Sequence, residues 1–101
     1  APGEPARDFV IRHEPEFTFR EIIDRVRSGH DMDGCEGIAH RDTDGESVIT
    51  PDRPLIKRLD ELPFPSRDTP PQHHFDIGYS PIVGSRGCHR DCSFCSIHSF
   101  Y

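Results

Sequence analysis

Three of the chain's four cysteines lie in one short stretch, "CHRDCSFC", residues 88–95. Cys88, Cys92 and Cys95 follow the spacing CxxxCxxC, and thiolates are ligands of iron–sulfur clusters and of zinc. A compact loop with this spacing can wrap one corner of a metal cluster, so that each thiolate binds a different iron. Three ligands for four irons would leave one iron open for chemistry, as three protein ligands do at a catalytic zinc.

The residues around these cysteines suit an anionic cluster. Arg86, His89 and Arg90 flank Cys88, and positive charge there would favour the thiolate form. The same side chains are equally well explained as solvated loop charges. Ser93 and Ser96 are short hydroxylated residues of the loop. Together with backbone N–H groups, they can donate hydrogen bonds to cluster sulfurs.

Other uses of the cysteines stay open at this stage. His98 extends the pattern to CxxxCxxCxxH, so Cys88, Cys92, Cys95 and His98 could form a structural zinc module. A ferredoxin-like electron carrier would need a fourth cysteine, and Cys35 lies far from the other three in sequence. Clustered thiols favour metal over two disulfides. We expect Cys35 to be a small packed residue outside the site.

The elements that must position this loop begin with a strand and a helix. The run "DFVIR", residues 8–12, is rich in strand-forming residues. Apolar residues then recur at the helical spacing i, i+3, i+4 and i+7, at Phe19, Ile22, Ile23 and Val26. We expect this apolar stripe to pack on a sheet.

Two signals compete for the start of the helix, and one marks its end. Pro15 is acceptable as a first helical residue, whereas Thr18 and Glu21 fit a capping box. Gly29 is the expected stop.

The middle of the chain predicts a hairpin followed by a linker. "GIAHRD" and "ESVIT" are short strand candidates, and Asp44 and Gly45 between them suit a tight turn. From Pro51 to Pro71 prolines accumulate around "LIKRLDEL", which we expect to form one or two helical turns within an extended segment. His73 and His74 are adjacent, so on an extended chain they point to opposite sides and make a poor chelating pair. Residues 76–85 read as a strand that leads into the cysteine loop.

Size and charge exclude several classes of protein. With 101 residues, 33% of them hydrophobic, and 10 prolines, the chain can enclose one small domain at most. The 12 basic residues are scattered and outnumbered by 18 acidic ones, giving a net charge of −6, which argues against nucleic-acid binding. No signal-peptide pattern and no apolar run near the roughly 20 residues that span a bilayer is present, so we expect a cytoplasmic protein without a membrane partner.

The motif and its surroundings resemble a known family, the radical S-adenosylmethionine (radical SAM) enzymes. Their hallmark is CxxxCxxC with an aromatic residue before the last cysteine, and "CHRDCSFC" matches it with Phe94. "SRGC", "CSI", "DFVIRHEPEFTF" and "LDELPFPSRD" look like the subgroup in which a cobalamin-binding domain precedes the radical domain. One departure is "HEPE", residues 13–16, where the subgroup usually has the glycine-rich "GEGE".

The resemblance implies an α/β fold and a fragment of a longer protein. Residues 1–50 would be the last strand, last helix and trailing hairpin of a Rossmann-like cobalamin-binding domain. Residues 51–75 would be a Pro-rich interdomain linker. Residues 76–101 would be the first strand and cluster loop of a radical SAM partial (β/α) barrel. We expect such a fragment to be inactive in isolation.

The same resemblance implies a mechanism. Cys88, Cys92 and Cys95 would hold a [4Fe-4S] cluster whose open iron binds S-adenosylmethionine, and Phe94 would lie by its adenine. Reductive cleavage would then give methionine and a 5′-deoxyadenosyl radical, with a low-potential electron donor as partner and cobalamin as a further cofactor. The substrate, a small molecule or another class, and the choice among methyl transfer, rearrangement and cyclisation stay open.

Overall fold

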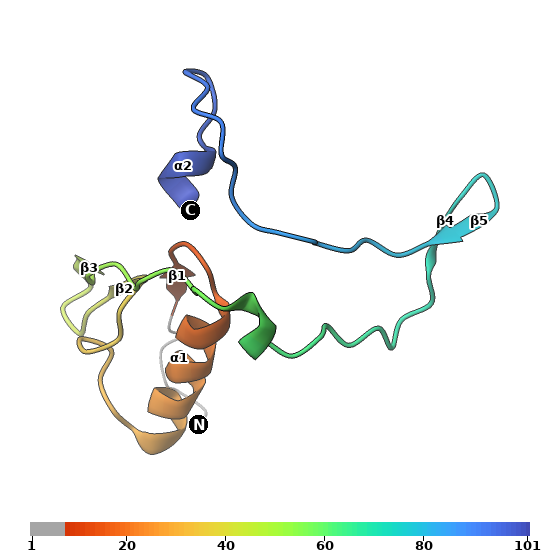
Figure 1. The fold of residues 1–101 in the computed structure, drawn as a ribbon. Coiled ribbons are helices and arrows are strands. Elements are labelled where there is room, and N and C mark those ends of the chain that lie inside the picture. Colours follow the sequence, from red (N-terminus) through yellow and green to blue (C-terminus); the bar gives the residue numbers. More distant parts are fainter. Residues whose placement is uncertain (1–7) are drawn as a thin grey trace. The chain divides into compact units, whose positions relative to one another are not determined.

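The computed structural model describes residues 8–101, so the first seven residues of the predicted segment 1–50 lie outside it. The chain forms two compact units that divide between Lys57 and Arg58. In chain order the first unit holds β1 (Phe9–Ile11), α1 (Glu16–Ser28), β2 (Ile38–Arg41) and β3 (Ser47–Ile49). The second holds the 3-10 helix η1 (Leu59–Glu61), β4 (Gln72–His74), β5 (Ile77–Tyr79) and α2 (Ile97–Phe100) (Figure 1).

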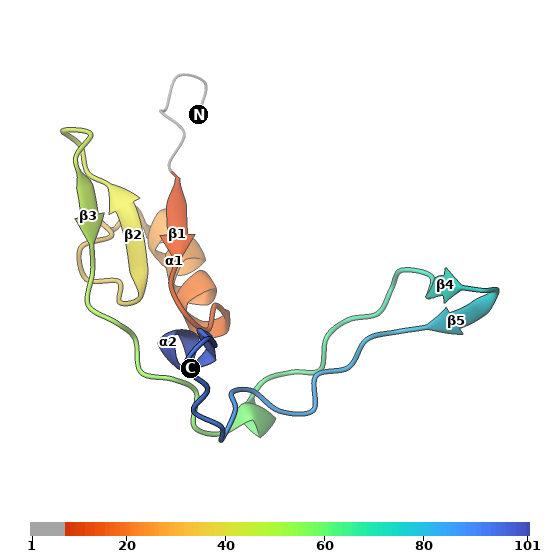
Figure 2. The ribbon, with the colours of Figure 1, turned by 90° about the horizontal axis from the view of Figure 1, so that it is seen from above.

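The first unit is a three-stranded antiparallel sheet with α1 against one face. The strand order is β1-β2-β3, and the register places Val10, Ala39 and Ile49 opposite one another. Residues that oppose each other share a face of the sheet. Val10 and Ile49 are 64% and 68% exposed, so their face is open, whereas the other face lies toward α1 (Figure 2). The predicted strand at residues 8–12 and the predicted hairpin are both confirmed.

The core of this unit is small. Its buried hydrophobic residues are Ile22, Met32, Cys35 and Ile38, and Phe9 and Ile11 pack against them. Cys35 is fully buried, which confirms that it is a packed residue outside the cysteine loop. Burial raises the pKa of its thiol, and the negative charge of Glu21 adds to that effect.

The apolar stripe of α1 is only partly used. Of the four residues that predicted the helix, Ile22 is buried, whereas Phe19 and Val26 are 56% and 53% exposed. The expectation that the whole stripe packs on the sheet is therefore wrong. Thr18 and Ile22 lie one turn apart on the helix and are its buried residues, because a sheet of three short strands contacts a narrow strip of the helix.

Backbone geometry decides between the two predicted starts of α1. Pro15 is the N-cap, and the N–H of Phe19 donates to its carbonyl at 2.7 Å. The capping box at Thr18 is wrong, because Thr18 lies inside the helix and is fully buried. Gly29 ends the helix as predicted. Its φ of 71° is left-handed, a conformation that glycine adopts without steric cost.

The β2–β3 hairpin closes through a side chain that the sequence did not single out. Asp42 Oδ1 accepts hydrogen bonds from the N–H groups of Asp44 and Glu46, both at 2.9 Å. The N–H of Gly45 donates to the Asp42 carbonyl at 3.1 Å. The turn at Asp44 and Gly45 is thus confirmed, and Asp42 organises it as aspartate does in turns of this kind.

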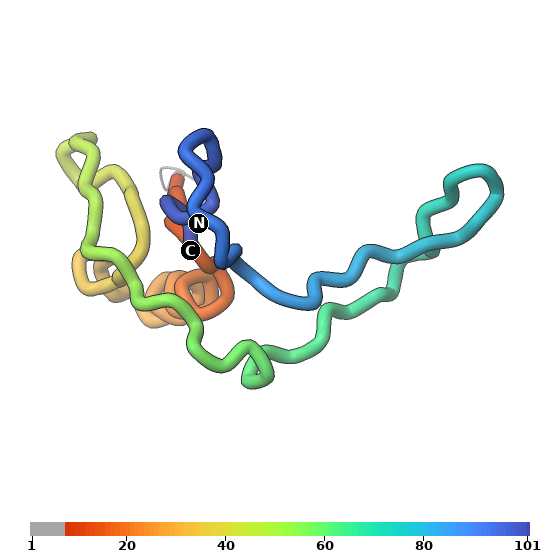
Figure 3. The backbone as a smooth tube through the Cα atoms, turned by 45° about the horizontal axis from the view of Figure 1, so that its top comes forward, coloured from red at the N-terminus to blue at the C-terminus, as the bar shows by residue number. Residues whose placement is uncertain are grey.

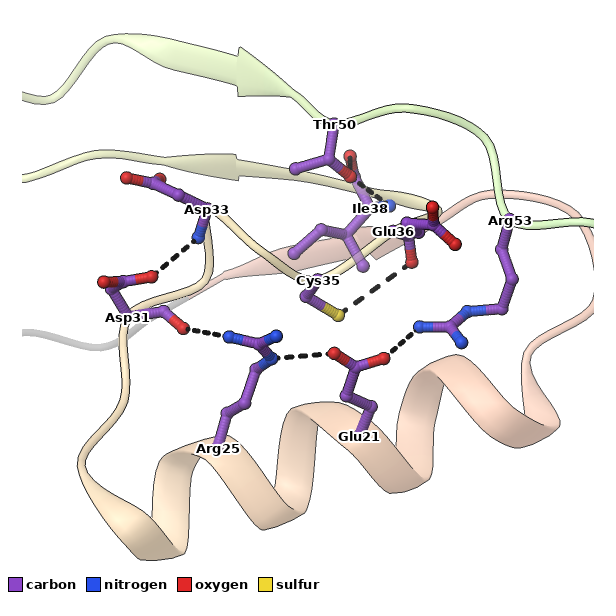
Figure 4. A network of polar contacts seen from close by, with 9 residues as sticks. All are labelled: Glu21, Arg25, Asp31, Asp33, Cys35, Glu36, Ile38, Thr50 and Arg53. Atoms are coloured by element: carbon purple, nitrogen blue, oxygen red, sulfur yellow. Dashed lines mark hydrogen bonds and ion pairs between the residues drawn. The ribbon is translucent and has the colours of Figure 1, made fainter.

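A network of charges joins α1 to the loop before β2 and to the segment after β3 (Figure 4). Glu21 accepts a hydrogen bond from Arg25 Nε at 2.8 Å and forms an ion pair with Arg53. Arg25 Nη1 also donates to the carbonyl of Asp31 at 3.0 Å. The side chain of Cys35 points toward this network. One carboxylate therefore connects segments that are far apart in sequence.

The second unit is built from local turns (Figure 3). The predicted helical turns in "LIKRLDEL" appear as η1, a single 3-10 turn. β4 pairs antiparallel with β5, and the two residues between them, Phe75 and Asp76, have φ of 49° and 60°. Two positive φ angles match the twist of a tight hairpin.

This hairpin corrects the strand predicted at residues 76–85. The strand is confined to Ile77–Tyr79, and residues 80–85 form no strand. Its partner, Gln72–His74, falls within the predicted linker 51–75. A strand needs hydrogen-bonding neighbours, and the tight turn supplies one next to it in sequence, so the chain pairs with itself here.

The Glu21 network predicts an acid-sensitive first unit. Burial raises the pKa of Glu21, but hydrogen bonds from Arg25 and Arg53 outweigh it and hold this pKa below its ordinary value. A group with a lowered folded-state pKa stabilises the fold above its unfolded pKa and loses that effect as the pH falls through its folded pKa. We expect Glu21→Gln to cost about 1 kcal/mol at neutral pH and little at acid pH. Denaturant unfolding of wild type and variant across pH measures this.

Glu61→Gln is the matched control for this prediction. Glu61 also pairs with an arginine, Arg58, but both side chains are more than half exposed. We expect it to change stability by less than about 0.5 kcal/mol at any pH. Equal pH profiles for Glu21→Gln and wild type would contradict the role given to the network.

Candidate functional site

The cysteine loop lies between β5 and α2. Residues 80–87 lead out of β5 without regular structure. Gly87, with φ of 82°, then turns the chain just before Cys88, a conformation that disfavours a side chain. The N–H of Cys95 donates to the carbonyl of Cys92 at 3.0 Å, which closes a turn around Ser93 and Phe94. Short backbone contacts of this kind give the loop its shape.

The three predicted ligands are accessible thiols. Cys88, Cys92 and Cys95 are all free and exposed, in contrast to buried Cys35. The N–H of Arg90 donates to Cys88 Sγ at 3.4 Å, a backbone donor to sulfur of the kind expected around a thiolate ligand. Hydrogen bonds from Ser93 and Ser96 to sulfur stay a prediction.

The thiols do not converge on a metal position in this structure. Within residues 8–101 no three His, Cys, Asp or Glu side chains are grouped so that they could hold a metal ion. The types of group present, three accessible thiols on one short loop and a backbone N–H that donates to sulfur, nevertheless suit a cluster with thiolate ligands. Coordination would draw the three sulfurs together, and metal binding and loop ordering are commonly coupled in this way.

His98 has a partner other than the thiols. Its Nε2 contacts the carbonyl oxygen of Arg90, and since a carbonyl only accepts, Nε2 is the donor. His98 also borders an open hollow of about 520 Å³ beside Cys88. Its lining residues are Ser85, Arg86, Gly87, Cys88, His89, His98 and Tyr101. The basic residues expected near Cys88 thus include two that line this hollow, Arg86 and His89.

Phe94 is 91% exposed, so its ring contributes little to packing. Exposing an apolar aromatic ring to water is unfavourable, and a ring in this position is free to stack on a planar ligand. This placement is compatible with the predicted position by an adenine.

The "HEPE" loop, at the other end of the chain, is occupied by structural contacts. His13 adopts a left-handed φ of 62°. Glu14 is buried, and its carboxylate accepts the N–H of Ile56 at 2.5 Å. Arg12 in front of the loop forms an ion pair with Asp52 at 2.5 Å. His13 stands where the subgroup has glycine, and these contacts of the loop are with the chain itself, so they add no support for cobalamin binding.

Two features of the loop region escaped sequence analysis. The contact of His98 involves the backbone carbonyl of Arg90, and a backbone group leaves no mark in the sequence. Tyr101 also lines the hollow and lies beside Gly87, where a Cβ would be 3.6 Å from Tyr101 Cβ. Neither contact follows from residue type or spacing.

None of the helices in residues 8–101 combines the length and the apolar character that crossing a membrane requires.

The chain is similar to parts of three curated enzymes. A protein named as an uncharacterized methyltransferase of Pyrococcus horikoshii is 36% identical over 95 residues, which cover 91% of this chain and 20% of that protein. The cytidylyl-2-hydroxyethylphosphonate methyltransferase of Streptomyces wedmorensis is 27% identical over 135 residues, covering 97% and 24%. The anaerobic magnesium-protoporphyrin IX monomethyl ester cyclase of Synechocystis is 28% identical over 101 residues, covering 97% and 20%.

The chain therefore spans about a fifth to a quarter of the length of these relatives. All three are named as enzymes, two for methyl transfer and one for cyclisation, which agrees with the expectation that the chain comes from an enzyme. No protein-family model and no solved structure matches the chain.

The different burial of the four cysteines predicts their reactivity. We expect native chain to take three iodoacetamide adducts, at Cys88, Cys92 and Cys95. Cys35 should react at least about tenfold more slowly until denaturant is added, because burial hides its sulfur and raises its pKa. Mass spectrometry of timed samples counts the adducts. The Cys35→Ala variant should take the same three, and rapid labelling of Cys35 in the wild type would contradict the described core.

Proposed function

We propose that this chain belongs to a radical SAM enzyme and carries its cluster loop. Cys88, Cys92 and Cys95 bind a [4Fe-4S] cluster through three irons, and the fourth iron is left for S-adenosylmethionine. The observation that carries the proposal is the exposure of all three thiols on one short loop with the spacing CxxxCxxC. The buried fourth cysteine cannot complete a closed, four-thiolate site without unfolding the core.

The relatives support the proposal from a second direction. The loop lies in a chain that is similar over 91–97% of its length to proteins named as methyltransferases and a cyclase. When bound, the cluster supplies the electron that cleaves S-adenosylmethionine to methionine and a 5′-deoxyadenosyl radical. A low-potential electron donor is the partner that this chemistry requires.

The cysteines and some of their neighbours have defined tasks in this proposal. The thiolates of the three cysteines fix the cluster at the end of the segment that follows β5. The Arg90 N–H donates to Cys88 Sγ and so stabilises negative charge on that sulfur. Arg86 borders the hollow beside Cys88 and places positive charge near it. Phe94 presents an exposed ring on which the adenine stacks.

The names of the relatives indicate two types of reaction for the whole protein. Two names favour methyl transfer and one favours cyclisation. Cobalamin is a proposal that rests on the resemblance of residues 1–50 to the end of a cobalamin-binding domain, and the "HEPE" loop gives it no support. Reaction type and substrate are set by parts of the longer protein.

The proposal predicts a cluster that responds to S-adenosylmethionine. Anaerobic reconstitution of the chain with iron and sulfide should give a [4Fe-4S] electron paramagnetic resonance signal after reduction. Adding S-adenosylmethionine should shift that signal, because it binds the open iron. Single alanine substitutions at Cys88, Cys92 and Cys95 should each abolish the signal, and Cys35→Ala should keep it.

A different result would favour the structural zinc module. If no cluster forms and the purified chain retains one zinc that is lost in His98→Ala, the enzyme assignment falls and Cys88, Cys92, Cys95 and His98 are the zinc ligands.

A second prediction concerns the aromatic residue before the last cysteine. Phe94→Ala should form the cluster normally but weaken S-adenosylmethionine binding about 5- to 100-fold, the range that stacking of a base on an aromatic ring provides. Titration of the spectral shift measures the affinity. Phe64→Ala is the matched control, since Phe64 is 98% exposed and lies outside the loop. Equal affinities of Phe94→Ala and Phe64→Ala would remove Phe94 from the site.

A further inference from the structure

The contact between α2 and the cysteine loop is a hydrogen bond across the loop. His98 Nε2 donates to the carbonyl of Arg90, and the segment between these two residues contains Cys92, Phe94 and Cys95. The contact therefore joins the two ends of the stretch that carries two of the three ligands and the exposed ring. Closing a flexible segment costs conformational entropy, and a contact at its ends offsets that cost before any metal binds.

Arg90 connects this contact to the first cysteine. Its carbonyl accepts from His98, while its N–H donates to Cys88 Sγ at 3.4 Å. The same residue thus links α2 on one side and the sulfur of Cys88 on the other. The loop is held from within by the N–H of Cys95 on the carbonyl of Cys92, at 3.0 Å. Each of the three cysteines thus takes part in a hydrogen bond of the loop, Cys88 with Arg90 and Cys92 with Cys95.

The backbone at His98 is held by the hydrogen bonds of the short helix α2. The N–H of Ser99 donates to the carbonyl of Ser96 at 2.9 Å, and the N–H of Tyr101 donates to that of Ile97 at 3.0 Å. Both bonds span His98, since each joins a residue before it in the sequence to a residue after it. A histidine held in this way presents its ring at one place with a smaller entropy loss than a side chain on an irregular segment.

We infer that His98 is a positioning residue that clamps the cysteine loop by donating from Nε2 to the Arg90 carbonyl. The clamp closes the segment that carries Cys92 and Cys95 in the cluster-free chain, which lowers the conformational entropy that cluster binding must still remove. His98 is then not a metal ligand through Nε2, because that nitrogen is already engaged. The consequence for cluster assembly rests on the proposed function, whereas the clamp itself does not.

The test compares two amides that mimic different ring nitrogens of histidine. In His98→Gln the amide nitrogen can take the place of Nε2 and donate to Arg90, whereas in His98→Asn it is too short to reach. His89→Asn is the matched control, because His89 borders the same hollow but is not part of the clamp. All variants are made in the full chain.

The first readout is amide hydrogen exchange in the cluster-free chain. We expect His98→Asn to raise the exchange rates of the Arg90 and Cys95 N–H groups about 2- to 10-fold, the range for one net hydrogen bond. His98→Gln and His89→Asn should stay at the wild-type rates. Amides of α1 serve as an internal reference against general unfolding. Equal exchange rates in His98→Asn and wild type would overturn the clamp. Exchange rates in His98→Gln as high as those in His98→Asn would also overturn it.

The second readout is cluster assembly at limiting iron and sulfide. We expect His98→Asn to lower the fraction of chains with a cluster 2- to 10-fold and His98→Gln to restore it. Normal assembly in His98→Asn would overturn the role of the clamp in assembly. If the wild type itself forms no cluster, the proposed function fails, and the exchange rates still decide whether the clamp exists.

Discussion

The first unit depends on one carboxylate, that of Glu21. It contacts Arg25 on its own helix and Arg53 beyond β3, while Arg25 also holds the carbonyl of Asp31 (Figure 4). Within residues 8–57 the sheet has three short strands and the buried apolar core has four residues, so hydrophobic burial alone provides a limited driving force. The charged network contributes additional stability, because it connects both segments that flank the β2–β3 hairpin to α1.

The second unit follows a different physical rule. Its order comes from turns between near neighbours: the β4–β5 hairpin, the turn that closes on Cys92, and the bonds around α2. Such turns give local shape with almost no buried surface. The thiols therefore lie open to solvent, and a ligand that binds all three would order the loop in a way that its few turns do not.

Local signals in the sequence were sufficient wherever the physical cause was also local. The strand at residues 8–12, the helix ending at Gly29 and the β2–β3 hairpin follow from periodicity and from glycine or aspartate in turns. The candidate ligands follow from cysteine spacing. The capping box at Thr18 is wrong, since Thr18 is buried against the sheet inside the helix. The strand predicted at residues 76–85 is only Ile77–Tyr79, the part that pairs with Gln72–His74.

The sequence by itself determined which residues can do chemistry: three thiols at fixed spacing, with Phe94 before the last. Tertiary structure decided what each of the remaining groups does. It buried Cys35 in the core of the first unit, paired Glu14 with the N–H of Ile56, and paired His98 with the carbonyl of Arg90. Residue type and spacing state which ligands are available, but a backbone N–H or carbonyl is the same at nearly every position. Only the folded chain selects which of them a side chain meets.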